Sequence, residues 1–314
     1  MSYLRYVARR AGFAVLSTYL VVTVTFLVIN STVRLRMRQR TALAAFGGAS
    51  EETLEKIRQG FIQARNLDTP VYVRYVDWLV DVTTFQWGYS FSYNRPVIAV
   101  LDGRVQATMA YVVPGALLAV LLGVLLGLFA ALARDGAFDW VARLGSYTLL
   151  GVPVFAVVLY LRYLSSGRVG PAVPVSGYLL AVVAVAVSLL AGQVRFARAA
   201  SLEQTGQAFV KMLRAKGANR LRLARHVLRN AAVPIVSLSL TELLAVLVLN
   251  IYIIESVVGI DGLAAASLRA IRDSDTPLVI WTTMVIVFIG ITGNFLQDVL
   301  YGYLDPRVRA DAEE

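Results

Sequence analysis

The sequence predicts an all-α integral membrane protein with six transmembrane helices. Of the 314 residues, 58% are hydrophobic and only 16% are charged, against about 25% charged in an ordinary soluble domain. The apolar residues form runs long enough to cross a bilayer, and basic residues gather beside those runs. A soluble protein of this composition could not cover its own surface, so we place the chain in the membrane.

Six apolar segments approach the roughly 20 residues that a helix needs to cross a hydrocarbon layer of about 30 Å. They are residues 11–29, 107–133, 145–164, 178–194, 231–254 and 278–304. The first could be a signal peptide, but it is longer than a typical signal-peptide core and no small-x-small cleavage site follows it. We therefore interpret it as an uncleaved helix. Gly123 and Gly127 in the second segment are spaced to allow close helix approach.

Basic residues in the connecting segments predict the orientation of these helices. If residues 1–10 are cytoplasmic, the inside segments hold sixteen Lys and Arg residues and the short outside loops hold four. We therefore expect both termini, including the tail at 305–314, on the cytoplasmic side of the cell membrane. Residues 30–104 then form a long first extracytoplasmic loop, in which Ser50 is placed to cap an amphipathic helix over 50–64. We expect one transmembrane domain over the whole chain.

The residue types that the chain lacks narrow its chemistry. There is no cysteine and only one histidine, His226, so disulfides, thiolate nucleophiles and a metal site are not expected. None of the three lysines is followed by Ser or Thr, so the chain carries no Gly-x-x-x-x-Gly-Lys-Ser/Thr phosphate-binding loop. The net charge of +10 lies beside apolar runs, which favours membrane topology over nucleic-acid binding. We expect neither catalytic residues nor a bound cofactor.

A basic loop at residues 195–233, predicted to be cytoplasmic, is the most informative segment. It holds nine basic residues and one acid, Glu203. Ser201 and Gln204 have the spacing of a capping box, so a helix is predicted to begin at Ser201. Gly217 is placed to end that helix. The apolar face between them is formed by Phe209, Val210, Met212 and Leu213.

A second helix is predicted after the glycine, with Asn219 as its N-cap. Its apolar face would be Leu221, Ala224, Val227 and Leu228. Two short helices broken at a glycine are suited to docking in a groove of another protein. The alternative is a surface segment held on anionic lipid by its arginines, which contribute about 1 kcal/mol each.

Short motifs follow one another in a familiar order along most of the chain. They are Arg5-Tyr-Val-Ala-Arg-Arg10, Pro70, Arg74-Tyr75, Trp78-Leu79, Trp87-Gly-Tyr-Ser90, Pro96-Val97, Arg104, Ala107-Thr108, Arg214-Ala-Lys-Gly217, Arg225-His-Val-Leu-Arg-Asn-Ala-Ala-Val-Pro234, Glu255-Ser-Val-Val-Gly259, Gly262-Leu263, Asp275, Pro277, Asp298 and Leu304-Asp-Pro-Arg307. Together they resemble the permeases of binding-protein-dependent ABC importers, and most closely the B-type subunit of dipeptide, oligopeptide and nickel transporters.

The resemblance implies a type I ABC importer permease fold and a non-enzymatic role in transport. Two such subunits, usually non-identical, would form the pathway, two partner ATPase subunits would bind ATP and Mg, and an outside binding protein would deliver the substrate. The ATPase-docking segment would be Lys211, Met212, Leu213, Ala215, Lys216, Gly217, Ala218 and Asn219. The substrate could be a dipeptide, an oligopeptide, a nickel chelate or another solute.

Two stretches depart from the pattern of this family. The Glu-Ala-Ala of sister permeases falls on Lys211-Met212-Leu213, and the family's Pro-Gly-Leu-Gly reads Asp261-Gly262-Leu263-Ala264. These differences bear on specificity and on the identity of the partners more than on the family itself.

Acidic residues in or near the predicted helices are further candidate sites. Glu242 lies roughly 16 Å into the fifth helix and should face protein or a wet cavity, because a charge at mid-membrane costs about 2.5–3.5 kcal/mol. It could line the pathway or hydrogen-bond the partner permease. Glu255 and Asp261 could belong to an outer gate or a binding-protein contact, or to a plain solvated turn. Asn250 joins them as a possible pathway or gate residue, and Asp298 should pair with a loop arginine.

Two other classes of protein would use the same sequence differently. A proton-coupled secondary carrier would use Glu242 and Asp298, because acids inside the membrane suit proton relays. A membrane-embedded hydrolase would need a nucleophile with a base, or a metal cluster, which one histidine does not supply.

Overall fold

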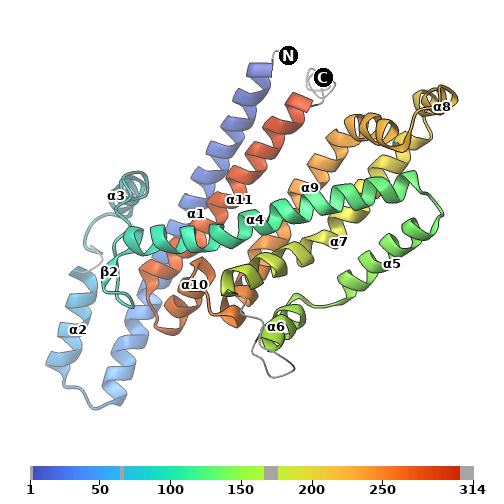
Figure 1. Ribbon diagram of the computed structural model, residues 1–314. Helices are drawn as coiled ribbons and strands as arrows, with labels where there is room; N and C mark the ends of the chain where they lie inside the picture. Colours follow the sequence, from blue (N-terminus) through green and yellow to red (C-terminus); the bar gives the residue numbers. More distant parts are fainter. Residues whose placement is uncertain (1–2, 64–66, 166–175, 305–314) are drawn as a thin grey trace. The chain divides into compact units, whose positions relative to one another are not determined.

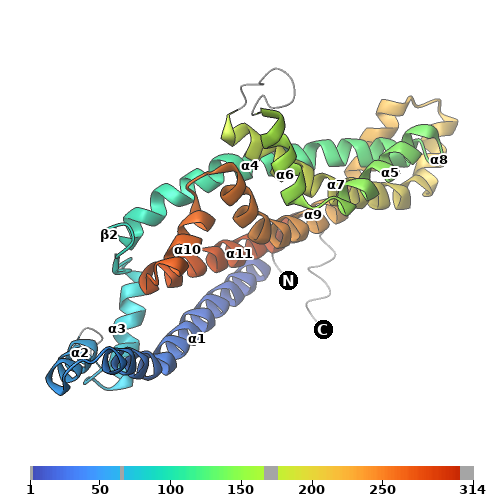
Figure 2. The same ribbon diagram turned by 90° about the horizontal axis from the view of Figure 1, so that it is seen from below.

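Helices make up almost all of the computed structural model, which describes residues 3–63, 67–165 and 176–304 (Figures 1 and 2). In chain order the elements are α1 (Tyr3–Phe46), α2 (Glu51–Gln63), α3 (Val71–Thr83), β1 (Tyr89–Ser90), β2 (Arg95–Pro96), α4 (Val97–Leu132), α5 (Ala137–Gly151), α6 (Val154–Ser165), α7 (Gly177–Thr205), α8 (Ala208–Ala215), α9 (Arg220–Val258), α10 (Leu263–Arg272) and α11 (Thr276–Leu304). The chain divides into two compact units, Gly12–Gly88 and Met1–Ala11 with Tyr89–Glu314.

The unit Gly12–Gly88 is built on the packing of α3 against α1. The indole Nε1 of Trp78 donates to the carbonyl oxygen of Val22 at 3.1 Å. The hydroxyl of Tyr75 lies 2.7 Å from Thr23 Oγ1, and its ring lies 5.2 Å from that of Phe26. The aromatic residues of α3 are therefore packed against α1 within the same unit.

The first helix is much longer than its apolar segment. The prediction ended it at residue 29, but α1 continues to Phe46 because the charged stretch after residue 29 contains neither glycine nor proline. Gly48, at a φ of 80°, ends it: the amide of Gly48 donates to Ala45 and that of Ala49 donates to Ala44. The predicted helix after this turn is confirmed as α2, with Ser50 Oγ accepting from the Thr53 amide at 3.4 Å.

Four helices are long and apolar enough to cross a membrane, namely α1, α4, α7 and α11. Two further spans arise if each of two bent helix pairs counts as one, which brings the described total to six. One pair is α5 with α6, bent by 94°, and the other is the end of α9 with α10, bent by 84°. The predicted number of spans is therefore reached only with broken segments.

The third predicted helix, at residues 145–164, is wrong as a continuous helix. It is broken between α5 and α6 at Val152 and Pro153. Proline disfavours the helical conformation of the residue before it and has no amide to donate. Val152 is accordingly extended, with φ −92° and ψ 117°.

The close contact of α4 with α7 forms the centre of the larger unit. Gly115, Gly123 and Gly127 are buried on α4 and face α7. A Cβ added to Gly127 would lie 2.5 Å from the carbonyl oxygen of Val194, and one added to Gly123 would collide with Gln193. Small residues allow two membrane helices to approach in this way, as the spacing of Gly123 and Gly127 predicted.

We expect Gly127→Val to destabilise the protein by about 1–3 kcal/mol, the usual cost of overpacking, because its Cβ would meet backbone rather than a flexible side chain. Gly103→Val is the matched control, since Gly103 is exposed on the same helix and nothing lies within 4 Å of its added Cβ. Thermal unfolding in mild detergent measures the difference. Equal midpoints for the two variants would contradict the packing role of Gly127.

Candidate functional site

The short helix α8 is anchored by an apolar face at one end of the larger unit. Val210 is fully buried, and Phe209 and Leu213 are half-buried beside it. These residues pack against the end of α4 at Leu128 and against the first turns of α9 at Leu223. Figures 1 and 2 both show α8 near the point where α4 passes into α5.

A Schellman turn connects α8 to α9. Gly217 takes a left-handed φ of 72°, its amide donates to Arg214 at 2.9 Å, and the amide of Ala218 donates to Leu213 at 3.0 Å. Asn219 then caps α9, because its Oδ1 accepts from the amide of Arg222 at 2.9 Å. The predicted helix end and the predicted cap are both confirmed.

The outer surface of α8 and its turn is exposed and basic. The residues exposed there are Lys211, Met212, Arg214, Ala215, Lys216 and Gly217. Leu213 and Ala218 are half-buried beneath them, and Asn219 is exposed. The predicted docking residues therefore form one continuous segment. Its cationic side chains and Met212 are exposed to the surroundings of the larger unit.

Three predictions within this basic loop are wrong. No helix begins at Ser201, since α7 runs on to Thr205 and the Ser201 side chain is buried inside it. The extension is stabilised because Ala197 and Ala200 continue the buried face of α7. Met212 and Leu221 are exposed rather than on apolar faces, and Leu223 takes the place of Leu221 because it packs with Ala224 and Val227 against Leu128 and Val210.

A second polar site surrounds Glu255 near the other end of α9. The carboxylate is 1% exposed, so the solvated turn considered from the sequence is wrong for this residue. Thr108 Oγ1 donates to Oε1 at 2.6 Å, Tyr111 OH donates to the same oxygen at 3.0 Å, and the Ala265 amide donates to Oε2 at 2.8 Å. One carboxylate thus joins α4, α9 and α10.

Gly262 leaves the space that this carboxylate occupies. A Cβ at this position would collide with Glu255 Oε1 and would lie 2.6 Å from Thr108 Oγ1. Thr108 Oγ1 also accepts from the Leu263 amide at 2.8 Å, which fixes the first turn of α10. Gly262 is the first glycine of the family's Pro-Gly-Leu-Gly motif, which reads Asp-Gly-Leu-Ala here, and the packing around Glu255 requires it. The helix α10 itself was not predicted.

The neighbouring acids Asp261 and Asp275 differ in their surroundings. Asp261 is exposed and forms an ion pair with Arg104 at 2.6 Å. Asp275 is buried and accepts from Ser90 Oγ at 2.6 Å and from the Ser92 amide at 2.9 Å, which joins the β1–β2 hairpin to the start of α11. Burial alone would raise the pKa of Asp275, but the hydrogen bonds from Ser90, Ser92 and Leu278 outweigh it and hold the pKa below its usual value.

The remaining predicted site residues do not converge on either place. Asp298 pairs with Arg10 of α1 at 3.2 Å rather than with an arginine of the basic loop. Asn250 is half-buried in α9. The side chain of Glu242 lies outside the described residues. Within the described ranges, no group of three His, Asp or Glu side chains is placed to hold a metal ion.

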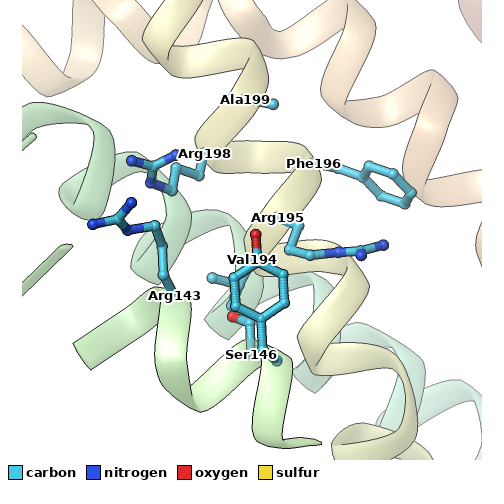
Figure 3. A pocket seen from close by; sticks show the side chains of 8 residues that line it. Arg143, Ser146, Val194, Arg195, Phe196, Arg198 and Ala199 are labelled. Atoms are coloured by element: carbon cyan, nitrogen blue, oxygen red, sulfur yellow. The ribbon is translucent and has the colours of Figure 1, made fainter. Parts of the chain in front are cut away.

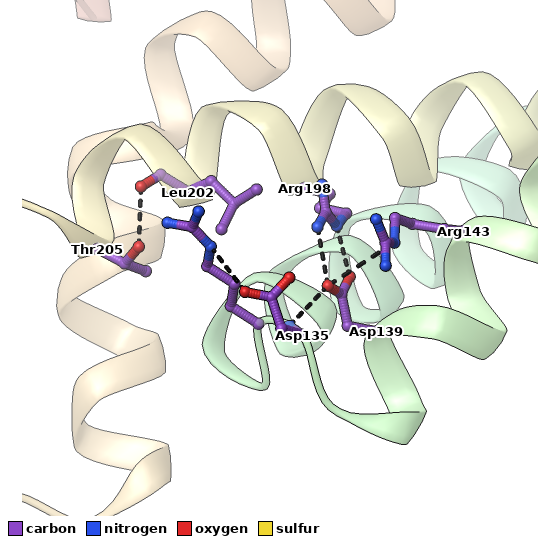
Figure 4. Close-up of polar contacts among 7 residues, drawn as sticks. Asp135, Asp139, Arg143, Arg198, Leu202 and Thr205 are labelled. Carbon is purple, nitrogen blue, oxygen red and sulfur yellow. Dashed lines mark hydrogen bonds and ion pairs between the residues drawn. The ribbon is translucent and has the colours of Figure 1, made fainter.

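A buried ion pair between α5 and α7 was missed by the sequence reasoning. Asp139 is 0% exposed and accepts two bonds from Arg198, at 2.5 Å from Nε and 2.8 Å from Nη2. Arg143 lies 3.8 Å from the same carboxylate (Figure 4). From the sequence, Arg143 and Arg198 predicted only the orientation of the helices. The one signal for this ion pair in the sequence is Asp139, an acid in the first turn of an otherwise largely apolar helix.

Comparison with known proteins gives this geometry a family. A family model described as "Binding-protein-dependent transport system inner membrane component" matches residues 123–310, more than half of the chain. The chain belongs to this family. It is a permease subunit of an ABC importer, a multi-pass protein of the inner membrane, and not an enzyme.

Relatives of this permease match almost its full length. A Brucella abortus (strain 2308) protein named as a peptide transport system permease is 30% identical and covers 97% of this chain and 99% of its own. The dipeptide transport system permease protein DppB of Lactococcus lactis is 27% identical with the same coverage. The metal-staphylopine import system permease protein CntB of Staphylococcus aureus is 28% identical over 77% of this chain and 79% of its own.

We expect Glu255→Ala to destabilise the permease strongly, because each buried donor left without an acceptor costs about 1–3 kcal/mol. Three donors, on Thr108, Tyr111 and Ala265, lose their acceptor at once. Asp261→Ala, which removes an exposed acid six positions further along, should cost no more than about 1 kcal/mol. Thermal unfolding midpoints in detergent compare the two. Similar midpoints would show that the Glu255 network does not hold α4, α9 and α10 together.

Proposed function

We propose that this permease imports di- or oligopeptides and that α8 with the Gly217 turn couples it to an ATPase subunit. The observation that carries the coupling role is a helix fixed from below by Val210 and exposed above, and closed by a turn that only glycine adopts without strain. A lipid-bound surface helix would place its apolar face outward. Here most of the apolar face is used against α4 and α9.

The chemistry of the exposed side suggests the groove that would receive it. Lys211, Arg214 and Lys216 place three cations around Met212, which is 53% exposed. An ATPase cleft with an apolar floor and an acidic rim would complement this arrangement, since methionine adapts to irregular apolar surfaces. The Lys-Met-Leu departure from the family's Glu-Ala-Ala would then select this permease's own ATPase.

The connections of α8 supply a route for coupling. Its anchor contacts the end of α4 at Leu128, and the Gly217 turn leads into α9 after two residues. The helix α9 is 39 residues long and carries Glu255 in its last turn before it ends at Val258. Movement of α8 on nucleotide binding would therefore reach α4 and α9, two of the three helices that meet at the Glu255 carboxylate, and ATP would shift the balance between two states of the pathway.

The proposed coupling also implies where the partner subunits of the transporter bind. We place both termini and α8 in the cytoplasm, where two ATPase subunits bind ATP and Mg, and the residues 30–104 on the outer side with the binding protein. A second, non-identical permease completes the pathway. The excess of basic residues in the segments on the α8 side supports this orientation.

The names of relatives support a peptide substrate. Two relatives that match 97% of this chain are named for peptide or dipeptide transport. A metal chelate is the second candidate, because the relative CntB is named for import of metal-staphylopine. A proton-coupled carrier loses support, since the family is ATP-driven and Asp298 is held in an ion pair with Arg10.

We expect Gly217→Trp to leave the permease inserted in the membrane while ATPase co-purification and ATP-dependent uptake fall to background. The large side chain would fill the space above the turn that docking requires. Recovery of the ATPase subunits with the tagged permease from mild detergent is the first measurement, and uptake by reconstituted transporter is the second.

Gly48→Trp is the matched control for this experiment. Gly48 has the same turn, a similar φ of 80° and nothing within 4 Å of an added Cβ, so the variant carries the same strain of about 1–3 kcal/mol far along the chain from α8. It should retain its ATPase subunits. Normal ATPase recovery and uptake by Gly217→Trp would refute the docking role.

We expect the transporter, reconstituted with its own binding protein, to accumulate a radiolabelled dipeptide when ATP is supplied. A radiolabelled nickel chelate, added under the same conditions, tests the second candidate. Uptake of the chelate without uptake of dipeptide would overturn the peptide assignment and leave the importer assignment intact.

A further inference from the structure

A cavity of about 300 Å³ lies between α5 and α7, and neither α8 nor Glu255 contributes to its lining (Figure 3). Its lining residues are Arg143, Ser146, Tyr147, Val194, Arg195, Phe196, Arg198 and Ala199. This volume is at the lower end of the range for small-molecule sites, roughly 300–1,000 Å³. The lining combines cationic groups with aromatic and aliphatic side chains, so its ligand should be partly anionic and partly apolar.

The charges around this cavity do not balance. Three arginines line it, and the buried Asp139 between α5 and α7 neutralises one of them through its two bonds from Arg198. The nearby Asp135 is itself paired with Arg134 at 3.3 Å. Arg195 has no acidic partner in the described part of the chain. A formal charge of +2 therefore remains.

The arginines also retain unused hydrogen-bond donors. The Nε of Arg143 is buried and has no hydrogen-bond acceptor within the described residues, because Asp139 is 3.8 Å away. The Nε therefore faces Asp139 in an ion pair rather than a hydrogen bond, and because the Arg143 side chain is 39% exposed its guanidinium remains accessible to a further acceptor. Figure 3 shows the guanidinium groups of Arg143 and Arg198 together on one side of the cavity, with that of Arg195 extending on the other.

The cavity lies where a membrane helix leaves the apolar layer. Arg195 follows directly on the apolar part of α7, residues 177–194, and is the first of the charged residues that lead to Thr205. Arg143 is six residues from the start of α5, which corresponds to about 9 Å along a helix. Arginines near the ends of apolar helices have the chemistry of the basic pockets between membrane helices that bind anionic lipid headgroups.

We propose that this cavity binds the phosphate of an anionic phospholipid. The phosphate would accept bonds from Arg143, Arg195 on the other side of the cavity would add a second positive charge, and the glycerol and first acyl carbons would lie against Val194 and Phe196. The amphipathic lining favours a lipid over free phosphate, which would use only the cationic groups. Binding at this place would join α5 to α7 through the ligand in addition to the Asp139–Arg198 pair, and so link the broken third span to the central helix pair.

The test uses the assembled transporter in nanodiscs that contain phosphatidylcholine with phosphatidylglycerol. After transfer to mild detergent, native mass spectrometry counts the lipids that remain bound. The unmodified transporter should retain phosphatidylglycerol in preference to phosphatidylcholine. The double variant Arg143→Gln with Arg195→Gln should bind phosphatidylglycerol on the order of tenfold more weakly, because each basic residue contributes to the attraction for anionic lipid.

Further variants separate binding from folding. Arg195→Gln alone changes an exposed side chain and should fold normally with reduced retention, whereas Arg195→Lys should restore most of it. Arg229→Gln, which removes an exposed arginine of α9 outside the cavity, should retain the lipid fully. Unchanged retention in the double variant, equal retention of both lipids, or displacement of the lipid by millimolar inorganic phosphate would each overturn the proposal.

Discussion

The close packing of α4 against α7 is the constraint on which the rest of the larger unit depends. Three glycines on α4 allow its backbone to approach α7 until a single added carbon would collide. Both polar sites use the helices that this contact holds. Thr108 and Tyr111 on α4 supply donors to Glu255, and Arg198 on α7 holds Asp139. With no hydrophobic drive between helices in lipid, such packing is a main source of association.

The helix α9 joins two sites of opposite character. At its start, Asn219 and the Gly217 turn adjoin an exposed basic surface. Near its end, the Glu255 carboxylate is buried and accepts hydrogen bonds from α4 and α10. A buried carboxylate is stable only while its donors stay in place, because each lost bond in a low-dielectric site is expensive. Any rearrangement of α9 relative to α4 therefore has to exchange the Glu255 bonds together, which favours two discrete arrangements over a continuous one.

Three of the four local cap and turn signals in the sequence predicted the structure correctly, and the capping box at Ser201 did not. Gly217, Asn219 and Ser50 act through residues within five positions along the chain, and all three form the predicted turn or cap. The two ion and hydrogen-bond networks could not be predicted in the same way. Arg198 lies 59 positions from Asp139, and Thr108 lies 147 positions from Glu255, so only the tertiary packing brings them together.

Proline shows why the spans were harder to predict than the turns. Pro114 lies inside the continuous helix α4, whereas Pro153 marks a break of 94°. The residue type is the same, but Pro114 is surrounded by buried neighbours, including Tyr111 and Gly115, that hold α4 against α7. Membrane helices tolerate proline when neighbouring helices compensate for the lost bond. Whether they do so is a property of the packing rather than of the segment.

The two Schellman turns separate what a glycine does for the fold from what it does for function. Gly48 and Gly217 end their helices with the same pair of backbone bonds and similar positive φ values. The conformational need for glycine is therefore equal at both positions and cannot by itself identify a site. What differs is the surroundings. The turn at Gly217 follows a helix anchored by Val210 and leads directly into α9, so a load applied there reaches the Glu255 network through continuous structure.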